Sequence, residues 1–370
     1  MWKPILLLSL VLVGLVWWDG TLGEEDATRR AESLRIGRLI SSEKQEELQG
    51  KVAFLQIEGA GRNWLYVPAA GRWRCLNFYG APVKSGDVDG LISKIWQAEG
   101  VVQSEDPDRF GDYGIGPLTN GVTRAITLHG ADAVEQTERG PSFRGDPLYA
   151  VEIGTAIPGR DGCYARLPGE EAVWAVDANP LPLLEVPEGA LRPPMLDPYV
   201  IPTGWPGQGL HVDRIQVWRP DETYALELEQ REVSEEELRS GVSPYFWTLK
   251  RGGLTVPSSE ALTRAYTIFV YRAPFARVLD PGAVDEGLFT SHSASVTFQV
   301  RSQEGAGADA PPPLEVIVSA RGQDGSAVIY NPNTGCYYAV SGDVASLFAP
   351  GAAALAEGVA ENPWEPFLSR

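Results

Sequence analysis

An internal duplication constrains this chain more than any other feature of its sequence, because each copy must then build its own fold unit and core. Trp73 precedes the proline of an Asp-Pro pair by 34 positions (73 to 107), and Trp247 does the same (247 to 281). The two copies align over this interval without a gap. The segments Val52–Ile57 and Val212–Val217 also match, since both alternate like a strand and carry Gln before the last aliphatic residue.

Each copy carries one helical pattern within the aligned interval. Apolar residues recur at i, i+3, i+4 and i+7 over Ser85–Ala98 and over Ser258–Tyr271, and the first serine of each is a suitable N-cap. This spacing predicts an amphipathic helix packed on a sheet, with Trp73 and Trp247 as structural residues of the preceding strands. The apolar positions are Val88, Leu91, Ile92, Ile95 and Trp96 in the first copy, and Leu262, Ala265, Tyr266, Phe269 and Val270 in the second.

Period-two patterns predict antiparallel strands around both helices. They cover Gly71–Leu76, Val122–Ile126, Leu148–Gly154, Cys163–Leu167 and Ala172–Asp177, and then Tyr245–Lys250, Val296–Val300, Leu314–Ala320, Ala327–Tyr330 and Cys336–Ser341. The last strands align in two ways. Gly162–Tyr164 matches Gly335–Tyr337 by letter, whereas strand order pairs Val173–Val176 with Tyr337–Val340, and we favour strand order. The predicted fold is α+β, with two tandem repeats of a mostly antiparallel sheet and one packed helix each.

An N-terminal transmembrane helix is expected before the repeats. The run Ile5–Trp18 reads ILLLSLVLVGLVWW, with Lys3 before it and Asp19, Glu24, Glu25 and Asp26 after it. This asymmetry of charge keeps the N-terminus cytoplasmic and sends the remaining chain across the membrane. A cleaved signal peptide, with a weak site at Thr21–Gly23, and a buried helix of a soluble domain are the alternatives.

The chain therefore divides into six predicted parts. They are an anchor at 1–18, a charged stalk at 19–50, repeat 1 at 51–185, a Pro-rich linker at 186–209, repeat 2 at 210–349 and a tail at 350–370. The stalk is expected to be helical around Arg29–Leu48, because it is rich in charged helix formers. The linker should be stiff because of its prolines, and the Ala/Gly-rich tail should be poorly packed.

The composition argues against several classes of function. A formal charge of −18 repels phosphate backbones, so nucleic acid is not expected as a partner. The three cysteines, Cys75, Cys163 and Cys336, form no C-x-x-C pair and no Cys/His cluster. We interpret them as small, partly buried residues, and the sequence leaves one disulfide open.

No motif identifies a catalytic, cofactor-binding or metal-binding residue. The histidines are His129, His211 and His292, and the pair His211 with Asp213 has too few ligands for a metal. Ser291–Ser293 surrounds a histidine but lacks the G-x-S-x-G context of a nucleophile. Gly204–Gly209 lacks the lysine of a phosphate loop and is expected to be a turn. The recurring Asp-Pro pairs are expected to be structural turns as well.

The layout resembles the bacterial domain of unknown function numbered 4340. The resemblance rests on the apolar N-terminus, the Trp73 strand with its helix, and a series of short segments. These are Ser104–Gly111, Tyr113–Ile115, Val151–Gly154, Gly162–Arg166 and Val173–Val176. It covers about 52–177 well and the second copy more loosely. It implies a single-pass membrane protein that is auxiliary to gliding-motility-type ABC transporters, and it carries over no catalytic or ligand residue.

The leading hypothesis is a non-enzymatic, membrane-anchored interaction module without a cofactor. We expect it in a bacterial inner membrane, with its bulk periplasmic or extracellular and with ABC transporter components as partners. Two alternatives remain open. One is a periplasmic glycan- or peptide-binding protein that uses exposed aromatic residues, for which Trp64, Trp174 and Trp205 are the candidates. The other is an enzyme of unrecognised class.

Overall fold

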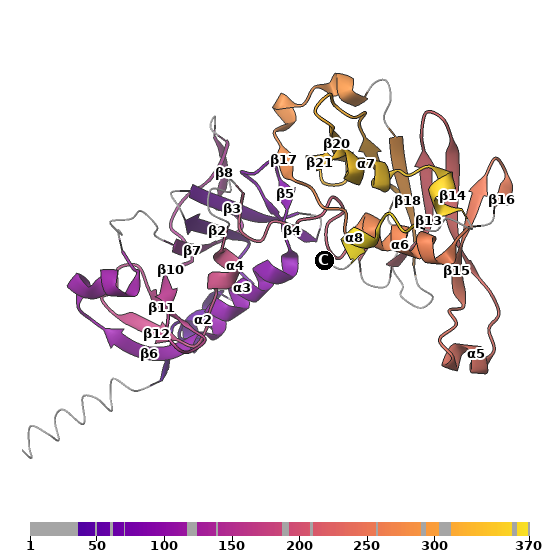
Figure 1. The fold of residues 1–370 in the computed structure, drawn as a ribbon. Coiled ribbons are helices and arrows are strands. Elements are labelled where there is room, and N and C mark those ends of the chain that lie inside the picture. Colours follow the sequence, from indigo (N-terminus) through magenta and orange to yellow (C-terminus); the bar gives the residue numbers. More distant parts are fainter. Residues whose placement is uncertain are drawn as a thin grey trace, which may run out of the picture. The chain divides into compact units, whose positions relative to one another are not determined.

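The computed structural model divides the chain into two compact units (Figure 1). Unit 1 comprises Met1–Pro68 and Ser85–Pro194, and unit 2 comprises Ala69–Lys84 and Met195–Arg370. The structure describes residues 36–48, 50–59, 62–69, 71–116, 124–137, 140–186, 192–207, 210–256, 258–289, 294–302, 312–356 and 361–368. The predicted anchor at 1–18 lies outside these residues. Within them, none of the helices combines the length and the apolar character needed to cross a bilayer.

Unit 1 is built on an antiparallel sheet. Its strands lie in the order β1 (Gly37–Arg38), β6 (Glu99–Ser104), β12 (Val173–Val176), β11 (Cys163–Arg166), β10 (Tyr149–Ala156), β7 (Arg124–His129), β2 (Phe54–Gly59) and β3 (Arg62–Ala69). The helix α3 (Ser85–Gln97) buries Val88, Leu91 and Ile95, as its spacing predicts. The remaining elements are α2 (Ser42–Leu48), the 3-10 helix η1 (Pro107–Tyr113), the hairpin β8–β9 (Val134–Thr137, Gly140–Phe143) and α4 (Leu181–Leu184).

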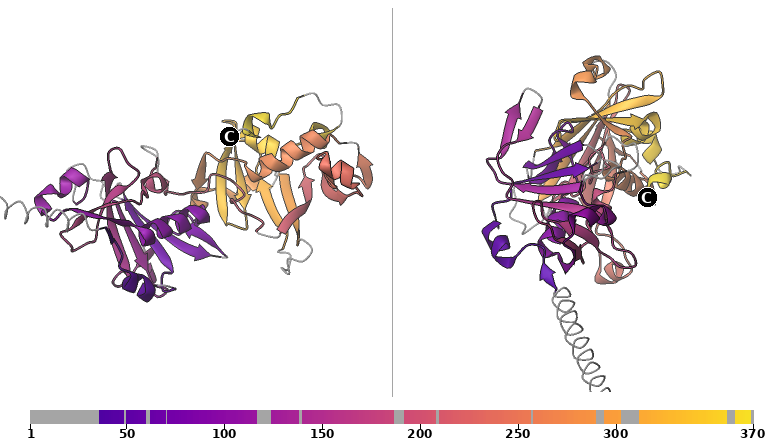
Figure 2. Two further views of the ribbon diagram at one scale, coloured as in Figure 1. Left: turned by 90° about the horizontal axis from the view of Figure 1, so that it is seen from below. Right: turned by 90° about the vertical axis from the view of Figure 1, so that its left-hand side faces the viewer.

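Unit 2 contains a second antiparallel sheet, and α6 (Glu260–Tyr271) lies across one face of it (Figure 2). The strand order is β16 (Leu254–Val256), β15 (Tyr245–Arg251), β14 (Thr223–Gln230), β13 (Leu210–Trp218), β18 (Ala294–Ser302), β19 (Leu314–Val318), β20 (Ser326–Asn331), β21 (Cys336–Ser341) and β17 (Arg277–Leu279). The other elements are α5 (Glu235–Arg239), η2 (Pro281–Ala283), η3 (Glu286–Phe289), α7 (Gly342–Phe348), η4 (Ala352–Leu355) and α8 (Glu365–Leu368). Predominantly antiparallel sheets with few helices confirm the α+β class.

The two sheets share one strand order. Neighbouring strands of unit 1 follow the order β6-β12-β11-β10-β7-β2-β3. The corresponding order in unit 2 is β17-β21-β20-β19-β18-β13-β14, in which each strand occupies the same place along the chain of its unit. In the chain, the helix of each unit comes directly before the first-named strand of its series: α3 before β6, and α6 before β17. This shared order is what the predicted duplication requires. In this order β12 (Val173–Val176) corresponds to β21 (Cys336–Ser341). The alignment of the two copies by strand order is therefore correct, and the alignment by identical letters is not.

The predicted stalk helix is present only at Ser42–Leu48 among its described residues, and the prediction is wrong for the residues before it. Gly37 and Arg38 form a strand that pairs with β6, and the helix α2 begins only at Ser42. The amide of Leu39 donates to the Ala98 carbonyl at 2.9 Å, and Leu39 is 5% exposed. Ile40 and Leu48 are buried in unit 1 as well, whereas Ile36 is 73% exposed. At Leu39 and Ile40 the burial of apolar side chains outweighs the helix propensity of their charged neighbours.

The Pro-rich linker from Met195 onward and the tail are parts of unit 2, contrary to expectation. Val200 and Ile201 are buried in its core, and the Val200 amide donates to the Ala273 carbonyl at 3.0 Å. Trp364 is fully buried, and its Nε1 donates to the Leu347 carbonyl at 3.2 Å. Each segment carries a few large apolar side chains among prolines or small residues, and those few residues decide its packing.

The hairpin β4 (Arg72–Cys75) and β5 (Ala81–Pro82), assigned from sequence to repeat 1, also belongs to unit 2. The guanidinium of Arg74 donates to the Thr334 carbonyl at 2.8 Å and to the Asn333 carbonyl at 2.9 Å. These bonds join the hairpin to the turn between β20 and β21. The position of this hairpin is therefore determined by contacts with residues that are distant in the sequence.

Candidate functional site

All three cysteines are free and buried. Burial raises the pKa of the Cys163 thiol to about 12 and also raises the pKa of the Cys336 thiol. Thiols in such surroundings stay protonated at neutral pH and are poor nucleophiles and poor metal ligands. Within the described ranges, no three His, Cys, Asp or Glu residues gather closely enough to hold a metal ion. The cysteines therefore contribute packing.

His129 has structural surroundings. His129 is 4% exposed, and its ring stacks on Phe143 with centroids 3.9 Å apart, while Nε2 lies 3.3 Å from Oε1 of Gln56. Burial lowers the pKa of His129. The carboxylate of Asp213, which the sequence places beside His211, pairs with Arg301 at 2.9 Å. His292 and the surrounding Ser291–Ser293 lie outside the described residues.

The recurring Asp-Pro pairs are helix caps. Asp106 accepts a hydrogen bond from the Asp108 amide at the start of η1, and Asp280 accepts one from the Gly282 amide at the start of η2. In both cases the proline occupies the first turn, where its missing N–H leaves no donor unsatisfied. These pairs are structural turns, as predicted.

The tryptophans are arranged differently from the expectation. Trp64 is 7% exposed, Trp174 is half-buried, and Trp205 packs edge-on against Phe298 with centroids 5.7 Å apart. None of these three presents an open ring. Trp218 is 45% exposed, and it is the only tryptophan in the described part of the chain that is largely open to solvent. The signal in the sequence was its place as the last outward-facing position of a strand.

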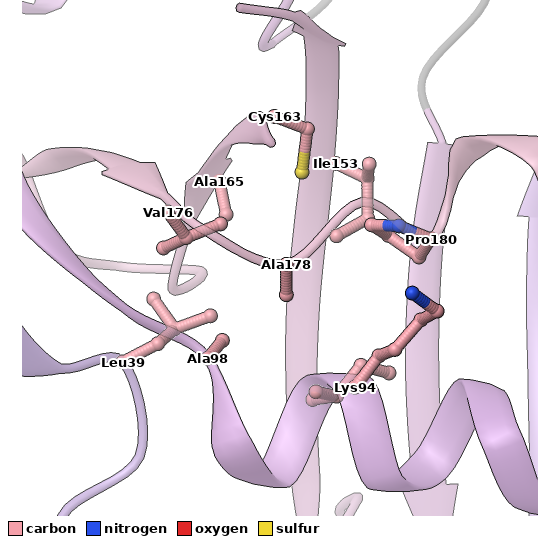
Figure 3. Close-up of a pocket in the computed structure, with 10 residues that line it drawn as sticks. Leu39, Lys94, Ala98, Ile153, Cys163, Ala165, Val176, Ala178 and Pro180 are labelled. Atoms are coloured by element: carbon pink, nitrogen blue, oxygen red, sulfur yellow. The ribbon is translucent and has the colours of Figure 1, made fainter. Parts of the chain in front are cut away.

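A small apolar cavity lies between α3 and the sheet of unit 1 (Figure 3). It holds only about 10 Å³, which is about the space of one water molecule. Its walls are almost entirely apolar, and a lone water there would lack partners. The lining residues are Leu39, Lys94, Ile95, Ala98, Ile153, Cys163, Ala165, Val176, Ala178 and Pro180. This cavity is a packing defect of the core and does not form a ligand site.

The most site-like feature is a hollow of about 310 Å³ on the outer face of the unit 2 sheet. Strand alternation creates this face, because Ile215 and Leu226 point into the core beneath α6 while their neighbours point away from it. The lining residues are Arg214, Gln216, Thr223, Tyr224, Ala225, Glu227, Lys250, Gly252 and Gly253. We define this set as the outer-face hollow.

The charges of the outer-face hollow are compensated. The Lys250 ammonium lies 2.6 Å from Oε2 of Glu227 and 3.0 Å from Oε1 of Glu229, and Nε of Arg214 lies 3.6 Å from Oε1 of Glu227. Hydrogen bonds to these two carboxylates raise the pKa of Lys250, and the hydrogen bond from Lys250 lowers the pKa of Glu229. Together with Glu229, which lies beside the hollow, two cations thus face two anions, and this region carries little net charge.

Comparison with known proteins adds no relative. No protein-family model, no curated protein and no solved structure matches the chain. The resemblance to the domain of unknown function numbered 4340 therefore stays a prediction.

Proposed function

We propose that this chain is a membrane-anchored, extracytoplasmic module that binds a protein partner through a sheet edge, as an accessory subunit of a gliding-motility-type ABC transport system. The assignment to a transport system comes from the sequence resemblance. The anchor comes from the run Ile5–Trp18 and the charges that flank it. The edge of the second sheet supports the binding role.

The open half of β15 is the observation that carries the binding role. This strand pairs with β14 from Tyr245 to Arg251, but it pairs with β16 only from Leu249 to Arg251. Among the described residues, no strand covers the outer edge of 245–248. Unpaired backbone groups at an edge accept an added strand from another chain, and main-chain hydrogen bonds then supply affinity.

Side chains at this edge suit a protein partner. Tyr245 is 50% exposed at the beginning of β15, and Leu254 is 71% exposed on the neighbouring β16. Trp247, two residues after Tyr245, packs partly buried against the core of unit 2. In protein interfaces a few large side chains, often aromatic, contribute most of the binding energy. Exposed side chains of this kind beside unpaired backbone groups therefore suit a binding surface.

The proposal is tested by site-specific photo-crosslinking of the full chain in its native membrane. A photoreactive amino acid replaces Tyr245 in one variant and Tyr79, which is 42% exposed on a different hairpin, in the control. The expected result is a crosslink from position 245 to a subunit of an ABC transporter and none from position 79. Equal yields at both positions, or no crosslinked transporter subunit, would reject the edge as the binding site.

The anchor is tested separately with a reporter that is active only outside the cytoplasm. Fused after Arg370, it should be active, and the mature chain should begin near Met1. A mature N-terminus at Glu24 would remove the anchor and keep only the export. An inactive reporter would remove both.

A further inference from the structure

Trp218 and the outer-face hollow lie on one face and at one end of the unit 2 sheet. Trp218 pairs directly with Thr223 of β14, which lines the hollow, and with Ser295 of β18. Directly paired residues point their side chains to the same face with Cβ atoms about 5 Å apart. Gln216, two residues before Trp218 on β13, therefore also shares its face. The exposed indole ring stands beside the hollow.

The lining of the hollow selects against charged ligands. Arg214 and Lys250 already face the carboxylates of Glu227 and Glu229, with the Lys250 ammonium 2.6 Å from Glu227. A bound anion would compete with these carboxylates, and a bound cation would compete with Lys250. A neutral ligand with hydroxyl groups can bind while these ion pairs stay intact. The paired carboxylates can still accept further hydrogen bonds, and the paired cations can still donate them.

The uncharged polar groups match hydroxyl-rich ligands. Gln216 has an amide that can donate and accept at once, and the Thr223 hydroxyl can do the same. The indole of Trp218 adds a flat apolar surface beside these groups. A sugar ring has the complementary construction, with an apolar C–H face and hydroxyl groups at its edge. The volume of about 310 Å³ lies at the small end of ligand sites, which span about 300–1,000 Å³.

We propose that the outer face of unit 2 binds a neutral polysaccharide, with one sugar ring stacked on Trp218 and the neighbouring ring in the outer-face hollow. The site shares Lys250 with β15 but includes none of its open half at 245–248, and the proposal does not rest on the transporter role. Binding is non-covalent, and selectivity for neutral over anionic polymers follows from the compensated charges.

The test measures retention of the full chain on insoluble neutral glucans and chitin, with soluble cello- and chito-oligosaccharides as competitors. An anionic polysaccharide, alginate, serves as the comparison. We expect binding to at least one neutral polymer that changes less than threefold between low and high salt, because no net charge drives it. We expect Trp218→Ala to weaken this binding at least tenfold and Gln216→Ala at least threefold, while Trp218→Tyr retains part of it.

The matched control is Leu254→Ala, which removes an even more exposed apolar side chain (71%). Its register with Arg251 places it on the opposite side of the sheet from Lys250. This variant should bind the glycan like the unaltered chain. The proposal is overturned if no neutral polymer is retained, if alginate is preferred, or if Trp218→Ala binds as well as the original. The proposal is also overturned if the unaltered chain binds a peptide at this site and Trp218→Ala abolishes that binding, because the site would then recognise protein. All variants must first show an unchanged unfolding temperature.

Discussion

Replacing Trp364 by alanine should destabilise unit 2 more than any surface substitution, although the residue lies only six positions before the end of the chain. Its side chain is fully buried, its ring lies 5.5 Å from that of Tyr266, and its Nε1 donates to the Leu347 carbonyl at 3.2 Å. Removing a buried tryptophan costs about 3–5 kcal/mol, because the transfer energy is lost and a cavity remains. The orphaned carbonyl of Leu347 adds to the cost unless water reaches it.

This cost is large relative to the stability of an ordinary domain, which is about 5–15 kcal/mol. For a unit of this size, about 4 kcal/mol lowers the unfolding temperature by roughly 8–16 °C. Calorimetry and urea unfolding of the full chain both measure the effect on the transition of unit 2. Trp364→Phe keeps a ring in the site but loses the Nε1 hydrogen bond, so it should cost about 1–2 kcal/mol.

Trp218→Ala is the matched control, because it removes the same side chain from a position that is 45% exposed. Its cost should stay within about 0.5 kcal/mol. If Trp364→Ala unfolded at the same temperature as the unaltered chain, the C-terminal segment would not belong to the core of unit 2. The assignment of the predicted tail to that core would then be wrong.

Three further predictions concern unit 1. Burial lowers the pKa of His129, so the unfolded chain binds a proton more readily; stability should be fully present above about pH 6.5 and should fall as the pH drops below it. Urea midpoints between pH 7.5 and 5 should show this slope, and His129→Gln should flatten it; an equal slope in both proteins would contradict the argument. Cys163, with its pKa raised to about 12, should resist iodoacetamide at pH 8 until the protein is denatured, and rapid labelling of the native chain would disprove its burial. Asp106→Ala should cost about 1 kcal/mol in urea unfolding by removing the cap of η1, while Asp106→Asn should keep most of that stability, and equal losses in both would exclude the cap as the cause.

Local periodicity in the sequence was sufficient to predict the helices α3 and α6 and most strands. The i, i+3, i+4 spacing identified α3 and α6, and the buried positions Leu91 and Tyr266 follow from it. Ile92 was expected on the buried face as well and is only half-buried, because it lies at the margin of the apolar stripe. These features depend on residues within a few positions of one another, which the sequence displays directly.

The candidate site could be predicted only in part. Alternation along Leu210–Trp218 places Gln216 and Trp218 on one face, and this can be read from the sequence. The helix α6 covers one of the two faces of this sheet. The alternation alone does not determine which of the two faces that is. The sequence therefore drew attention to Trp64 and Trp205, which the fold packs away, and passed over Trp218, which it leaves open.

The sequence by itself determined the period of α3, α6 and most strands, the turns at the Asp-Pro pairs, and the repeated order of strands along the chain. Only the tertiary structure decided which short apolar segments join a core. Val200 and Trp364 stand among prolines and small residues with no periodic context, yet both are fully buried in unit 2. Burial of such residues depends on surfaces built by distant parts of the chain, such as Ala273 and Tyr266. The free energy gained by removing a large apolar side chain from water outweighs weak local preferences, and it depends on neighbours that no local pattern encodes.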